Sequence, residues 1–61
     1  MDNETRSRIS AQIIDLKSRI PEIERDIGDA KRAGLGDMVK ADEQTLIKMK
    51  ALLDKLQAVY G

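Results

Sequence analysis

Apolar residues recur at alternating intervals of four and three positions through the first half of the chain. The members of this stripe are Ile9, Ile13, Leu16, Ile20, Ile23, Ile27 and Ala30. This spacing keeps one face of an α-helix apolar, whereas a half-buried β-strand would alternate at every second residue. The pattern therefore predicts a long helix whose heptad seam must be covered by another helix.

The second half of the chain carries a broader stripe with the same period. Its central positions are Met38, Asp42, Thr45, Met49, Leu52, Leu56 and Val59, and its flanking positions are Leu46, Leu53, Tyr60 and Ala41. An arc of about 140° on a helical wheel is typical of a helix in a bundle rather than of a two-stranded seam. The second helix is thus predicted to have more apolar surface than a single partner covers.

The first helix is predicted over about residues 4–33. Asp2, Asn3 and Thr5 can each cap the exposed N–H groups at its start. Gly34 follows the last periodic residue and is expected to adopt the left-handed conformation that ends many helices.

A turn over residues 34–37 is predicted to reverse the chain. Leu35 lies where a Schellman motif places its apolar contact with Ala30, and Asp37 is the expected N-cap of a second helix over about 38–60. Two helices joined by so short a turn must pack antiparallel. The fold class is therefore all-α, a single coiled-coil-like two-helix hairpin formed by the whole 61-residue chain.

Antiparallel pairing about this turn also predicts which residues meet. Ile23 should lie near Leu46 and Met49, and Leu16 near Leu53. The expected core consists of Ile13, Leu16, Ile20, Ile23, Met49, Leu53 and Leu56. Asp42 is a polar residue in the second stripe, and two interpretations stay open for it: pairing with Lys31 across the hairpin, or simple fraying of the seam near the turn.

Pro21 interrupts the first helix pattern and leaves two alternatives. A proline inside a helix removes one backbone hydrogen bond and costs about 3 kcal/mol, so the helix could kink there or break near Ser18. The heptad phase passes through Ile20 and Ile23 without a slip. This favours a continuous helix with a kink near Pro21.

A chain of 61 residues has little core of its own. Without cysteine or histidine it has no disulfide, no thiolate zinc site and no imidazole ligand. Self-association is the remaining route to stability, and dimerisation would complete a four-helix bundle. The residues expected at such an interface are Ile14, Ile47, Leu46 and Leu52.

The remaining composition argues against most chemistry. Eleven basic residues balance eleven acidic ones, so net charge attracts neither nucleic acid nor an anionic membrane. No apolar run approaches the roughly 20 residues of a membrane span, and the acidic first residues are unlike a signal peptide. No nucleophile–histidine pair or metal-ligand cluster occurs. The chain is expected to be a cytoplasmic non-enzyme without cofactor, metal or small-molecule ligand.

The predicted function is that of a protein–protein interaction or oligomerisation module, whose partner is a second copy or another helical protein. One alternative is a small dimeric regulatory nucleic-acid-binding protein. Its basic helical face would comprise Arg6, Arg8, Lys17, Arg19, Lys48, Lys50 and Lys55. A further alternative is an excised or designed coiled-coil segment without independent activity.

Overall fold

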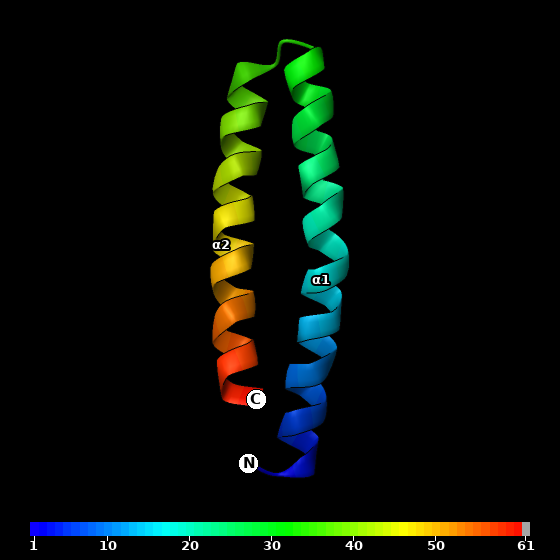
Figure 1. Cartoon of the computed structure of the whole chain (residues 1–61), viewed down its shortest axis with the longest axis vertical. Coiled ribbons are helices and arrows are strands. Elements are labelled where there is room, and N and C mark those ends of the chain that lie inside the picture. Colours follow the sequence, from blue (N-terminus) through cyan, green and yellow to red (C-terminus); the bar gives the residue numbers. More distant parts are fainter. Residues whose placement is uncertain (61) are drawn as a thin grey trace.

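The computed structural model describes residues 1–60, which form two long antiparallel helices (Figure 1). Helix α1 spans Asn3–Arg32 and helix α2 spans Gly36–Tyr60. No strand occurs among the described residues, and the molecule is a rod with extents of 47 × 15 × 13 Å. The predicted all-α hairpin is confirmed.

Helix α1 begins with a side-chain cap supplied by Asp2. Its extended backbone brings a carboxylate oxygen within 2.7 Å of the Thr5 N–H, which donates a hydrogen bond to it. The Arg6 N–H donates to the Asp2 carbonyl at 3.0 Å. Of the three capping residues considered from the sequence, Asp2 is therefore the cap, and Asn3 and Thr5 lie inside the helix.

This cap makes helix α1 sensitive to acid. The backbone hydrogen bond from Thr5 lowers the pKa of Asp2 below its ordinary value of 3.8. A carboxyl group with a lowered folded-state pKa stabilises the fold fully above its unfolded pKa, and that contribution is lost as pH falls through the folded value. We expect wild type to lose more helical stability between about pH 7 and about pH 2 than an Asp2→Asn variant, which keeps a cap but does not titrate. Urea denaturation followed by circular dichroism at both pH values measures this difference, and equal losses in the two proteins would contradict it.

Helix α1 ends in a complete Schellman motif. The Leu35 N–H donates to the Ala30 carbonyl at 2.9 Å, and the Gly34 N–H donates to the Lys31 carbonyl at 3.2 Å. Gly34 has a φ of +73°, a conformation that costs a glycine little and other residues more. The predicted role of Gly34 is confirmed.

Helix α2 begins at Gly36, two residues earlier than predicted. The Leu35 carbonyl accepts the first helical hydrogen bond, from the Val39 N–H at 3.0 Å. Leu35 thus closes the end of α1 with its N–H and opens α2 with its carbonyl. The prediction that Asp37 is the N-cap was wrong, because Asp37 lies within the first turn, where its carboxylate suits the helix dipole.

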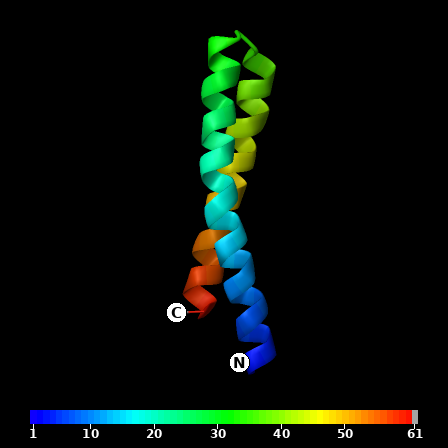
Figure 2. The same ribbon diagram turned by 90° about the vertical axis from the view of Figure 1, so that its right-hand side faces the viewer.

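Helix α1 is unbroken through Pro21. Figure 2 shows α1 curving, so that its blue N-terminal half departs from the line of its green C-terminal half. Pro21 is exposed, away from the seam, where the unpaired Lys17 carbonyl can meet water. Of the two alternatives, the continuous helix is the one observed.

The core lies in one narrow seam between the helices. All seven members of the first stripe are buried or half-buried, and the fully buried ones are Ile13, Leu16, Ile27 and Ala30. Helix α2 has no fully buried residue. Its half-buried residues are Val39, Asp42, Leu46, Met49, Leu53 and Leu56. The seven predicted core residues are confirmed, since each is buried or half-buried in this seam.

The seam on α2 is rotated from the predicted stripe by one heptad position. Met38, Thr45, Leu52 and Val59 were expected to face α1, yet all four are exposed. Their places are taken by Val39, Leu46 and Leu53, which are half-buried and pack against the narrow stripe of α1. The apolar stripe of α1 is narrow and covers only part of the broader stripe of α2. Met38, Thr45, Leu52 and Val59 therefore remain uncovered.

Contacts along the rod confirm the predicted register. Met49 and Ile23 line the same depression between the helices. The Lys50 ammonium lies 3.9 Å from a carboxylate oxygen of Glu24. At the open end, the Arg6 guanidinium lies 5.2 Å from the centre of the Tyr60 ring.

Candidate interaction surfaces

The seam divides the surface of the hairpin into two long faces. We name them the Met38 face and the Lys50 face. On the Met38 face, Met38 lies in one depression with Asp26 and Asp29 of α1. On the Lys50 face, Glu24 and Lys50 form an ion pair across the helices. Residues seven apart share a side of a coiled-coil helix, so both faces run along the whole rod.

The Met38 face carries a row of apolar side chains on α2. Met38, Leu52 and Val59 are 52%, 49% and 58% exposed. Thr45 completes the seven-residue spacing, and its hydroxyl donates to the Ala41 carbonyl at 3.1 Å. Members of the row are about 10 Å apart along the helix axis. We call these four residues the Met38 row, which borders the seam along its length.

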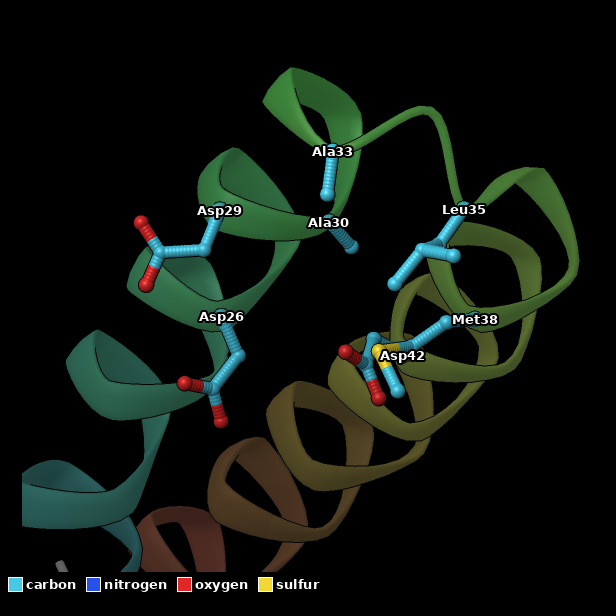
Figure 3. Close-up of a pocket in the computed structure, with 7 residues that line it drawn as sticks. All are labelled: Asp26, Asp29, Ala30, Ala33, Leu35, Met38 and Asp42. Carbon is cyan, nitrogen blue, oxygen red and sulfur yellow. The ribbon is translucent and has the colours of Figure 1, made fainter.

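Figure 3 shows the turn end of the Met38 face, where a depression is lined by residues of both helices. Leu35 and Met38 extend from the α2 side towards Ala30, whereas the Asp29 side chain points away from α2. Asp29 is held by an ion pair with Arg32. The turn end therefore combines an apolar floor with an acidic α1 edge.

Asp42 lies in the seam at this depression, where it is half-buried. Within residues 1–60 its carboxylate forms no ion pair, so the predicted pairing with Lys31 is not observed. Lys31 lines a different depression, together with Glu43. The two residues lie on opposite sides of the seam, since Asp42 faces the Met38 side.

Charged residues follow both edges of the Met38 face with a seven-residue period. The acidic row on α1 consists of Asp15, Glu22 and Asp29, and the basic row on α2 consists of Lys48 and Lys55. The Asp15 carboxylate forms an ion pair with the Arg19 guanidinium at 3.0 Å. Glu22, Lys48 and Lys55 form no ion pair with any other residue of the described part of the chain. Over residues 15–29 the α1 edge of the Met38 face is thus acidic, with Arg8 one heptad before it, whereas the α2 edge is basic at Lys48 and Lys55.

The Lys50 face presents mostly charged side chains along the seam. Ile14 flanks it on α1, 66% exposed, in a depression shared with Ser10 and Tyr60. Ile47 is also exposed and lies one turn from Lys50 on the same side of α2. The two isoleucines lie on different helices and on separate edges of this face.

The four residues expected at an interface are therefore not brought together. Leu52 belongs to the Met38 face, and Ile14 and Ile47 flank the Lys50 face. Leu46 is half-buried in the seam of the hairpin itself. Sequence reasoning missed the Met38 row because it placed all four members in the stripe that was to face the first helix, and only Leu52 also at the interface.

The seven residues of the proposed basic face are divided as well. Three have carboxylate partners: Arg8 with Glu4 at 2.8 Å, Arg19 with Asp15, and Lys50 with Glu24. Arg6 stacks over Tyr60. Lys17 follows the Lys50 face, whereas Lys48 and Lys55 follow the Met38 face. Acidic residues separate them, so they do not form one continuous strip.

Among residues 1–60 no group of three or more His, Cys, Asp or Glu side chains is placed to hold a metal ion. Neither of the two described helices is both long and apolar enough to cross a membrane. Comparison of the chain with protein families, curated proteins and solved structures found no match.

Proposed function

We propose that this chain is a non-enzymatic interaction module that self-associates through the Met38 face. The observation that carries the proposal is the Met38 row, in which three exposed apolar side chains and Thr45 follow one another directly beside the seam. Scattered apolar residues are normal on a protein surface, but a periodic row along a helix is typical of a helix-packing surface. Burying this row against another helix would widen the seam into a bundle core.

The small core of the hairpin supports the same proposal. Among residues 1–60 four apolar side chains are buried, all of them on α1, and each of the four keeps 3–9% of its surface exposed. The chain has no cysteine to form a disulfide. Burial of a large apolar side chain contributes about 1.5–3 kcal/mol, so covering the exposed half of each member of the row adds roughly 1 kcal/mol. A second copy would contribute the same again.

The dimensions of the rod are adequate for a stable interface. The molecule is 47 Å long and 15 Å wide. One such face has an area of the same order as the roughly 800 Å² per partner of a standard protein–protein interface. Neither a cleft nor a loop is needed, because the contact surface is already built on rigid helices.

A lysine in the Met38 row should dissociate the assembly. We expect Leu52→Lys to weaken self-association by about tenfold or more, because the interface would have to bury an unpaired ammonium group. Ile47→Lys is the matched control, since Ile47 is an equally large exposed residue on the other face and should leave association unchanged. Sedimentation equilibrium over a concentration series measures both, and circular dichroism confirms that each variant stays helical.

Two results would contradict the proposal. A wild-type chain that remains a fully helical monomer at high micromolar concentration has no self-association to explain. Dissociation by Ile47→Lys but not by Leu52→Lys would place the contact on the Lys50 face, around the isoleucines first suggested by the sequence.

A further inference from the structure

We infer that the second copy docks on the Met38 face with both turns at the same end of the assembly. This arrangement has a two-fold axis parallel to the rod, so that α2 of each copy packs on α1 of its partner. The inference rests on the proposed function, and it adds the orientation of the partner and the residues that select it. The observation behind it is the match between the acidic and basic rows.

The two rows lie at matching heights along the rod. Met49 lies beside Ile23, and Lys50 reaches Glu24. Neighbouring residues follow in antiparallel order, so Lys48 lies within one helical turn of the height of Glu22. Seven residues further along α2, Lys55 lies within one turn of the height of Asp15. The spacing of charges on α2 thus repeats the spacing on α1.

A two-fold axis parallel to the rod preserves these heights. It sets α2 against the partner's α1 and brings the basic edge of one copy over the acidic edge of the other. Lys48 then faces the partner's Glu22, and Lys55 faces the partner's Asp15. Symmetry repeats both pairs, so four ion pairs border the contact. Long lysine side chains span the remaining offset while their stems cover apolar surface.

The Met38 row finds suitable neighbours in the same arrangement. At the turn end, Met38 lies at the height of the partner's Ala33, a small apolar residue. Leu52 lies at the height of the partner's Arg19, whose aliphatic stem can cover it. Thr45 lies at the height of the partner's Asp26, and its hydroxyl would have to exchange its hydrogen bond to the Ala41 carbonyl to donate to that carboxylate. Met38 and Leu52 thus each meet an apolar group of the partner.

The opposite orientation is disfavoured by charge. With the two-fold axis perpendicular to the rod, α2 packs on the partner's α2 and α1 on the partner's α1. The basic row then faces the partner's basic row, and Glu22 approaches the partner's acidic row. Like charges placed together at a contact edge oppose association and suppress wrong pairings. Electrostatic complementarity therefore selects the arrangement with the turns together.

Charge reversal tests this orientation directly. One variant carries Lys48→Glu and Lys55→Glu, and a second carries Asp15→Lys and Glu22→Lys. All four residues are exposed, so neither variant removes core packing. We expect each variant alone to dimerise about tenfold more weakly, since every rim pair becomes repulsive, and an equimolar mixture to recover wild-type affinity. The control is Lys17→Glu with Lys40→Glu, which makes the same change of net charge away from the Met38 face.

The outcomes separate this inference from the proposed function. If the first variant is no weaker than the control while Leu52→Lys still dissociates the dimer, the orientation is wrong and self-association through the Met38 face stands. A monomeric wild type overturns both. A second measurement uses salt: added salt should weaken the wild-type dimer and strengthen the dimer of each charge-reversed variant, and the absence of this opposite response overturns the orientation.

Discussion

Replacing Pro21 with alanine is expected to raise the free energy of unfolding of the hairpin by about 2–3 kcal/mol. Pro21 lies inside α1, which is unbroken around it, so an alanine fits the backbone already present. The substitution supplies the missing N–H to the Lys17 carbonyl and removes the clash of the proline ring with that turn. Pro21 is exposed, so no packing is lost.

Urea denaturation followed by circular dichroism, at one fixed protein concentration, measures this gain. A fixed concentration is needed because self-association itself adds to the apparent stability. Arg25→Ala is the control, one turn further along α1 at an exposed position outside the proposed contact, and its effect should stay within about 0.5 kcal/mol. Pro21→Ala with unchanged or reduced stability would show that the proline relieves a strain that a straight helix would introduce.

The second large effect is expected from the adjacent isoleucines of α1. Ile13 is 9% exposed in the seam, whereas Ile14 is 66% exposed on the edge of the Lys50 face. Ile13→Ala should lower the free energy of unfolding by about 2–4 kcal/mol, because it removes buried methyl groups and leaves a cavity. Ile14→Ala removes the same atoms from a solvent-exposed position, and the free energy of unfolding should change by no more than about 0.5 kcal/mol.

This pair is closely matched, because the two residues have the same side chain and neighbouring places in one helix. Thermal and urea unfolding of both variants, compared with wild type, give the two changes. Equal destabilisation by both substitutions would mean that the Lys50 face is also covered in the assembled protein. A large effect of Ile14→Ala that grows with protein concentration would assign Ile14 to the contact between copies.

Much of the fold could be predicted because local signals agreed with one another. The stripe of α1 has a single width and phase, so its seam was predicted residue by residue. Gly34 lies directly after the last periodic residue and before an apolar Leu35, a combination that few structures other than a Schellman motif satisfy. The intact phase around Pro21 indicated an unbroken helix.

The seam of α2 could not be predicted in the same way. Asp42, Met49 and Leu56 can form a seam with either of two neighbouring rows, the Met38 row or the row of Val39, Leu46 and Leu53. Periodicity leaves both rows possible, because each is apolar and each keeps the heptad. The choice depends on the rotation of α2 about its own axis after the turn, which the periodicity of the sequence does not determine.

The same uncertainty hid the candidate interaction surface. Ile14 and Ile47 stood out in the sequence because no predicted stripe included them. The Met38 row did not stand out, since it formed part of the stripe that was predicted to face α1. The widths of the two stripes could have revealed this surface. The stripe of α1 occupies two heptad positions and the stripe of α2 occupies three, so one heptad position of α2 must remain outside the seam of the hairpin.

The Schellman turn also gives the rod two unequal ends. At one end Gly34 and Leu35 tie the helices together through backbone hydrogen bonds, close to the buried Ile27 and Ala30. At the other end the helices are free (Figure 1), and the contact across them is the stacking of Arg6 on Tyr60. The free energy of local unfolding is therefore lowest at the free ends, and unfolding proceeds from there towards the turn. An assembly with its turns together would gather all four fraying ends at one pole and leave the other pole rigid.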